Sequence, residues 1–234
     1  GRFDPDGCTW NVDDPRGVVL LAGDSQSWAV ADGLIAAAGQ LGYSTTVASL
    51  NGCSFVLPAG AEELNDKAVA CGVFRRAVLD HATLTGPAIV VISNWSVGYV
   101  RDTPDSRDLW ETGLAGVLGP LEAIGVPVII VSSYPAGDEH SINRSLLVGP
   151  RADRSTDAAR QRAERDWLVD LESEIADSYG SVYLFDPYEV FCDREFCRTA
   201  EDGNEYYTDT NHLSRAGSLL LVPSLEELLA STLG

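Results

Sequence analysis

The stretch GVVLLAGDS, residues 17–25, is the clearest indication of the fold of this chain. A continuous apolar run of this length is typical of a β-strand that is covered on both faces. The residues that follow, from Gln26 to Leu41, have apolar side chains at the spacing of an α-helix. A strand that passes directly into a helix is the first half of a βαβ unit, so this stretch predicts an α/β fold.

The same alternation continues along the chain. Four more apolar or β-branched runs predict strands: YSTTVASL (43–50), PAIVVIS (87–93), VPVIIVS (126–132) and VYLF (182–185). Helical patterns accompany them at 26–41, 62–84, 109–124, 156–179 and 214–233. The pattern predicts a three-layer α/β/α sandwich with a parallel sheet of about five strands, which is a flavodoxin-like arrangement. No repeat or linker interrupts it, so we expect one domain over residues 1–234, with an irregular, turn-rich loop from Asp186 to Asn211.

The composition excludes several classes of function. The chain has 234 residues, 45% of them hydrophobic, which is too apolar for a disordered protein. Its formal net charge is −19 and its pI is about 4.3. Because an acidic surface repels phosphate groups, we expect no nucleic-acid partner.

The five cysteines bear on the cellular compartment. Their spacings do not match the paired knuckles of a zinc site, and we expect neither a metal nor a cofactor. Two local pairs, Cys53 with Cys71 and Cys192 with Cys197, would each close a short loop as a disulfide, with Cys8 left over. The alternative is five reduced thiols in a cytosolic protein. The loop-rich surroundings of the four paired residues favour disulfides and an exported domain.

Candidate reactive residues follow the predicted strands. In a parallel sheet, ligands bind beyond the carboxyl ends of the strands. Ser25 comes directly after the first strand, and Gly52 and Asn94 lie just after the second and third. Asp209 and His212 stand three residues apart, immediately before the last helix.

These residue types suit nucleophilic catalysis. A serine hydroxyl becomes a good nucleophile when a histidine takes its proton, and a carboxylate orients that histidine. The N–H groups at the start of a helix also stabilise an oxyanion, and Ser25 is placed to use them. Asp209 equally suits a second role as the N-cap of the last helix.

Gly23-Asp24-Ser25 after the first strand, together with Asp209-Thr210-Asn211-His212 before the last helix, resembles the SGNH (GDSL-type) hydrolase family. The resemblance covers essentially the whole chain. It implies that Ser25 is the nucleophile, His212 the base and Asp209 its orienter. It also implies that Ser25, Gly52 and Asn94 form the oxyanion hole.

The chain is most similar to one branch of that family, the extracytoplasmic SGNH domains fused behind membrane acyltransferases of family three. The leading cysteine, the Asn-Gly-Cys of residues 51–53, the late cysteine pair and the run Tyr207–Ser214 carry this resemblance. It implies the C-terminal, soluble part of a larger membrane protein, located in the periplasm or at the cell surface. It also implies an acyl donor delivered by the membrane acyltransferase domain of the same polypeptide.

The function that the resemblance implies is transfer of an acyl group, in the first place acetyl, to a hydroxyl of an envelope carbohydrate or glycolipid. Trp95 and Gln26 stand beside the proposed site, so we expect them to bind substrate. Many relatives have a histidine where this chain has Gln26, and of the family's Gly-x-Asn-Asp block only Asn94 is present. Two alternatives stay open, a carbohydrate O-acetyl esterase that uses water and a non-catalytic domain that binds envelope glycans.

Overall fold

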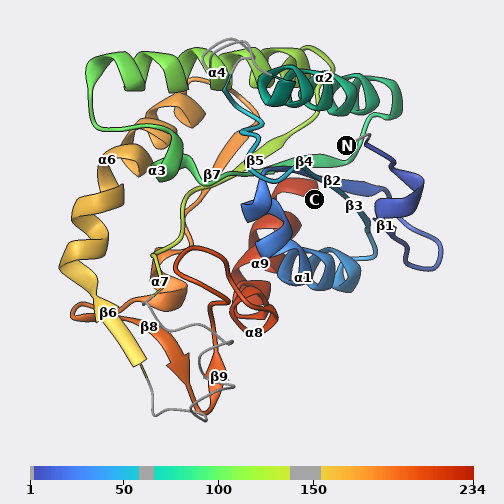
Figure 1. Cartoon of the computed structure of the whole chain (residues 1–234). Helices are drawn as coiled ribbons and strands as arrows, with labels where there is room; N and C mark the ends of the chain where they lie inside the picture. The colour runs from blue at the N-terminus through green and yellow to red at the C-terminus, as the bar shows by residue number, and fades with distance from the viewer. Residues whose placement is uncertain (1–2, 58–65, 138–153) are drawn as a thin grey trace.

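A computed structural model describes residues 3–57, 66–137 and 154–234 (Figure 1). Its centre is a six-stranded sheet of order β1-β3-β2-β4-β5-β7, in which five neighbouring strands are parallel. The strands are β1 (Thr9–Trp10), β2 (Val18–Gly23), β3 (Ser44–Ser49), β4 (Ile89–Ser93), β5 (Val128–Val131) and β7 (Val182–Phe185). The predicted parallel sheet is confirmed. The short β1 is an addition that pairs antiparallel with the edge of β3.

Helices cover both faces of the sheet, which makes the three predicted layers (Figure 1). They are α1 (Ser25–Gln40), α2 (Asp66–Thr85), α4 (Pro104–Ala123), α6 (Ala158–Asp177), α8 (Arg215–Leu219) and α9 (Val222–Leu233), with the single turn α3 (Ser96–Tyr99) and a 3-10 turn at Asp6–Cys8. The strand β2 shows why two cores form. Val19 and Leu21 pack in the core beneath α1 and α9, whereas Leu20 and Ala22 pack in the core beneath α2 and α4, because successive side chains of a strand point to opposite faces.

At the end of the chain, the structure differs from the prediction of a single helix. The helix expected over 214–233 is two helices, α8 and α9, separated at Leu220 and Leu221. Pro223 lies in the first turn of α9, where its missing N–H would be unpaired in any case, so the proline starts a new helix there. Within the described ranges, no helix is both long and apolar enough to cross a membrane.

The region from Asp186 to Asn211 also differs from the prediction, because it is not irregular throughout. It contains the single turn α7 (Tyr188–Phe191) and two strands, β8 (Phe196–Glu201) and β9 (Asn204–Glu205). With β6 (Arg154–Asp157) these strands form a second antiparallel sheet of order β6-β8-β9. The strand β9 leads directly into residues 206–214, so this small sheet carries the segment that contains Asp209 and His212.

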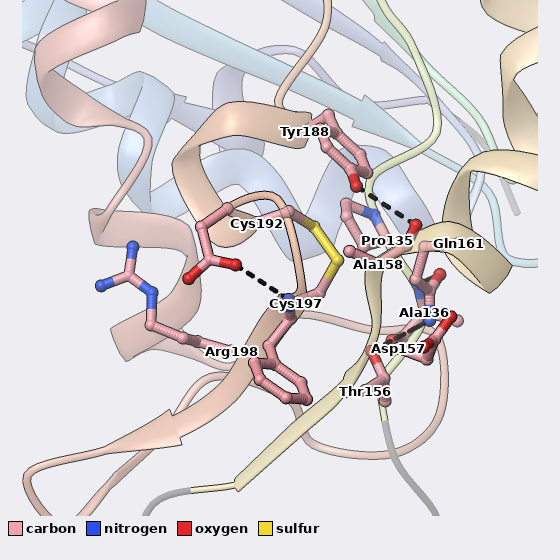
Figure 2. The surroundings of a disulfide bond; sticks show 12 residues. Pro135, Ala136, Thr156, Asp157, Ala158, Gln161, Tyr188, Cys192, Cys197 and Arg198 are labelled. Carbon is pink, nitrogen blue, oxygen red and sulfur yellow. Dashed lines mark hydrogen bonds between the residues drawn. A yellow bond between two sulfur atoms is a disulfide. The ribbon is translucent and has the colours of Figure 1, made fainter.

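The disulfide Cys192–Cys197 closes the end of α7 onto β8, with the two Cα atoms 3.9 Å apart (Figure 2). Beside it, the Tyr188 hydroxyl donates to the Ala158 carbonyl at 3.2 Å, which ties α7 to the start of α6. The disulfide therefore ties β8 to α7, and the hydrogen bond of Tyr188 ties α7 to α6.

A second disulfide joins Cys53, in the loop after β3, to Cys71 on α2, with a Cα separation of 5.2 Å. Both pairs suggested by the sequence are thus bonded in the structure, and Cys8 is free.

Candidate active site

The turn between β2 and α1 brings Ser25 to the carboxyl edge of the sheet. Here β2 approaches β4 so closely that a Cβ on Gly23 would lie 1.8 Å from the carbonyl oxygen of Ser93, so only glycine fits. Asp24 caps α1, with its Oδ1 accepting the Gln26 N–H at 2.8 Å. Ser25 is the first helical residue, and its N–H therefore lies at the positive end of the helix.

Asp24 also joins the nucleophile turn to the next loop. Its second oxygen accepts the N–H of Trp95 at 3.0 Å, and its side chain is only 1% exposed. Burial raises the pKa of Asp24, and the hydrogen bonds from the Trp95 and Gln26 N–H groups oppose that rise. The sequence predicts no role for Asp24 beyond its motif, and the structure shows it as the link between two loops of the site.

Ser25, His212 and Asp209 form one hydrogen-bonded chain. The Nε2 atom of His212 lies 2.8 Å from Ser25 Oγ, although the two residues are 187 positions apart. The other ring nitrogen, Nδ1, lies 2.7 Å from Asp209 Oδ2. This is the order of groups in which a carboxylate orients a histidine that takes the proton of a serine.

The carboxylate of Asp209 is held in its charged form. Its Oδ1 accepts the N–H groups of Asn211 at 2.9 Å and of His212 at 2.8 Å. Burial acts to raise the pKa of Asp209, but these hydrogen bonds and the contact with the His212 ring outweigh it and hold the pKa below its ordinary value. A charged Asp209 stabilises the imidazolium that forms when His212 accepts a proton.

The segment that carries this pair is closed upon itself. Tyr207 and Leu213 form an antiparallel bridge, and the N–H of Thr208 donates to the His212 carbonyl at 2.9 Å. Ser214 then caps α8 through its side chain. The segment is therefore a tight hairpin-like turn, fixed at one end by β9 and at the other by α8.

The two further candidates for an oxyanion hole lie in the loops after β3 and β4. Asn94 is 3% exposed, and its Oδ1 accepts the N–H of Phe55 at 2.9 Å. Gly52 lies in a turn with a φ of 66°. Within the described part of the chain, the Nδ2 of Asn94 and the backbone N–H groups of Ser25 and Gly52 have no acceptor. Among the described residues, these three donor groups are therefore free to bind an acceptor from outside the chain.

A small cavity of about 50 Å³ is lined in part by Gln26 and Asn211, which are the sequence neighbours of Ser25 and His212. The residues that line it are Gln26, Asn94, Trp95, Val97, Ser133, Tyr134, Pro135, Ala136, Gln161, Glu164, Arg165 and Asn211. Trp95 is 42% exposed there, as a substrate-binding side chain would be. Gln26, in contrast, is 2% exposed, and both ends of its amide are bonded within the protein.

Tyr134 lines the same cavity, and the sequence did not lead us to predict it as a site residue. Its place just after a strand, at the same edge of the sheet, was a usable signal.

Comparison with known proteins agrees with this geometry. A family model described as "SGNH domain (fused to AT3 domains)" matches residues 2–227. A search of curated protein sequences finds no match.

Several solved structures share the fold. The lipopolysaccharide acetyltransferase periplasmic domain of Salmonella ser. Paratyphi A has a TM-score of 0.73 at 15% identity, over 96% of this chain and 87% of that one. The acetyl-xylooligosaccharide esterase Axe2 of Geobacillus has a TM-score of 0.54 at 16% identity, over 94% and 95%. A lipase/acylhydrolase of Enterococcus faecalis has a TM-score of 0.52 at 15% identity, over 92% and 95%.

At these identities the structural likeness concerns the fold, while the family model concerns nearly the whole sequence. The chain is accordingly a serine enzyme of the acyl-transferring and hydrolytic kind, and it belongs to the family of SGNH domains that are fused to AT3 domains.

Proposed function

We propose that this chain transfers an acyl group, in the first place acetyl, to a hydroxyl of an envelope carbohydrate or glycolipid through an acyl-enzyme on Ser25. The observation that carries the proposal is the hydrogen-bonded chain from Asp209 through His212 to Ser25, with contacts of 2.7 and 2.8 Å. The fold brings Ser25 and His212 into contact although they are 187 positions apart.

The first half of the reaction forms the acyl-enzyme. His212 Nε2 takes the proton of Ser25 Oγ as that oxygen attacks the acyl carbonyl of the donor. Negative charge develops on the carbonyl oxygen, and the free donors of Ser25, Gly52 and Asn94 stabilise it. The tetrahedral intermediate then collapses, and the protonated His212 returns its proton to the leaving group.

The second half delivers the acyl group. A sugar hydroxyl loses its proton to His212 and attacks the acyl-enzyme, which releases the acylated sugar and restores Ser25. The exposed indole of Trp95, at the rim of the cavity, offers a flat apolar surface against which a sugar ring packs. The acyl donor comes from the membrane acyltransferase domain of the same polypeptide in this scheme.

The proposed location is extracytoplasmic, with a membrane tether in the full-length protein. Two disulfides support an oxidising compartment, since such bonds are rare in the cytosol. The family's fusion to membrane domains supports the tether.

Hydrolysis is the second candidate, and one observation favours it for the isolated domain. The side chains of His212 and Asp209 are 30% and 50% exposed, so water reaches the acyl-enzyme freely. Transfer needs water to be excluded, which an acceptor seated on Trp95 would accomplish.

The test uses the purified domain and 4-nitrophenyl acetate, with and without oligosaccharide acceptors. Ser25→Ala and His212→Ala should each lower turnover by about 10³-fold or more, and Asp209→Asn should lower it less. Ser231→Ala, on the exposed side of α9, is the matched control and should retain full activity. Turnover of Ser25→Ala at the rate of the unmodified domain would overturn the proposal.

The acceptor step has its own test. Trp95→Ala should raise the acceptor concentration needed for half-maximal transfer while hydrolysis in buffer stays within about two-fold. Hydrolysis that never yields to transfer at any acceptor concentration would support the esterase instead.

A further inference from the structure

The two peptide groups that flank His212 are both held by side chains from other parts of the fold. The carbonyl of Asn211, which belongs to the peptide before His212, accepts from Gln26 Nε2 at 2.7 Å and from the Tyr134 hydroxyl at 3.0 Å. The N–H of Leu213, which belongs to the peptide after it, donates to the same Tyr134 oxygen at 3.4 Å. Hydrogen bonds thus hold the backbone of the proposed base on both sides.

Gln26 and Tyr134 also bind each other, because the single hydroxyl proton of Tyr134 is shared between Gln26 Oε1 and the Asn211 carbonyl. Gln26 is 2% exposed and Tyr134 is 8% exposed. The Tyr134 ring packs against Phe191 and Tyr207, with centroids 6.5 and 6.3 Å away. Burial raises the pKa of Tyr134 well above its ordinary value, so its hydroxyl keeps its proton at neutral pH.

The position of Gln26 in the chain links these hydrogen bonds to the nucleophile. It follows Ser25 directly in the first turn of α1, so one helical turn carries the nucleophile and also holds the segment of the base. Tyr134 adds a second point from the loop after β5. Asp209 meanwhile binds the N–H groups of Asn211 and His212 on the other side of the segment.

We propose that Gln26 and Tyr134 are positioning residues that set the His212 ring against Ser25 Oγ, an inference that rests on the proposed acyl-enzyme function. Gln26 does not bind substrate through its amide in this assignment, because both ends of that amide are already bonded. Loss of these hydrogen bonds lets His212 move relative to Ser25, and a displacement of about 1 Å lowers the rate of the catalysed reaction by about 100-fold.

The experiment compares Tyr134→Phe and Gln26→Met with Tyr207→Phe. Tyr207 is the matched control, since it is a buried tyrosine of the same aromatic cluster whose hydroxyl donates to the Pro135 carbonyl at 2.6 Å and contacts neither peptide of His212. Both Tyr→Phe changes remove one buried hydroxyl and should lower the thermal midpoint to a similar extent.

Activity should separate the variants. With 4-nitrophenyl acetate, we expect kcat to fall about 10- to 100-fold in Tyr134→Phe and Gln26→Met with KM unchanged, and to stay within about two-fold in Tyr207→Phe. The rate at which a fluorophosphonate labels Ser25 should fall by the same factor as kcat, because labelling reports the activation of the serine without any acceptor.

The two proposals fail differently. If Ser25→Ala leaves turnover unchanged in the otherwise unmodified domain, the proposed function is wrong. If turnover depends on Ser25 but Tyr134→Phe and Gln26→Met keep the original kcat and labelling rate, the positioning role is wrong. An effect on KM alone would also overturn it and indicate a substrate contact. Circular dichroism identifies a variant that does not fold, and the remaining one then decides.

Discussion

A buried carboxyl group behind the site gives a quantitative prediction of how stability depends on pH. Glu172 on α6 is 0% exposed, and its Oε1 accepts from Trp110 Nε1 at 3.2 Å. Burial raises the pKa of Glu172 from 4.5 to about 7, and its polar neighbours, of which Ser132 is the strongest, offset only part of that rise.

Whether stability rises or falls with pH depends on which state, folded or unfolded, binds more protons. Below pH 4.5 both the folded and the unfolded chain hold the proton, and this group's contribution to stability is fully present. As the pH rises from there to about 7, the unfolded chain releases the proton while the folded chain keeps it, so stability falls with each step. At about 1.4 kcal/mol per pH unit, the total loss is about 3 kcal/mol.

Glu172→Gln removes the titrating group while keeping its size and its acceptor for Trp110. About 2.5 kcal/mol of this loss falls between pH 5 and pH 8. The thermal midpoint of this variant relative to the unmodified protein should therefore rise by about 5 to 10 °C over that range, since about 1 kcal/mol corresponds to about 2 to 4 °C in a chain of this length. Differential scanning calorimetry at several pH values measures it. Glu174→Gln, on the exposed side of the same helix, is the control. Midpoints of Glu172→Gln and the unmodified protein that stay parallel from pH 5 to 8 would contradict this prediction.

Two other predictions concern the disulfides and the proposed triad. Replacing Cys53 and Cys71 by alanine opens a loop of 18 positions and should lower the free energy of unfolding by about 3 kcal/mol, measured by denaturant titration; an unchanged midpoint under oxidising conditions would contradict this. Burial acts to raise the pKa of Asp209, but hydrogen bonds from Asn211 and His212 lower it, so Asp209 stabilises the fold above pH 3.8 and loses that effect as the pH falls through its lower folded value. The difference in thermal midpoint between Asp209→Asn and the unmodified protein should accordingly be constant from pH 8 to 5 and shrink below 3.8, and a difference that grows there would be contrary evidence.

The layered fold and the candidate nucleophile could be predicted from the sequence alone. Parallel strands buried on both faces leave long apolar runs such as Val18–Gly23, and the helices between them carry their own period, so both signals are local. Ser25 and the pair Asp209 and His212 could also be predicted as candidate site residues, because each lies next to a strand or helix whose place in the fold was already predicted. The carboxyl edge of a parallel sheet then brings such residues together.

The second sheet and the roles of several polar side chains became known only from contacts between distant parts of the chain. Strands as short as Asn204–Glu205 are too brief to show a period, and their pairing with β8 depends on contacts elsewhere in the chain. Gln26 reads from the sequence as a polar residue beside the nucleophile, and no local pattern tells that its amide binds Asn211, 185 positions away. Glu172 likewise reads as one of many acids on an amphipathic helix, and only the packing of α4 and β5 against it makes it a buried carboxyl. Hydrogen bonds between distant segments form because the whole fold places the partners, and for that reason they leave no trace in the sequence around either one.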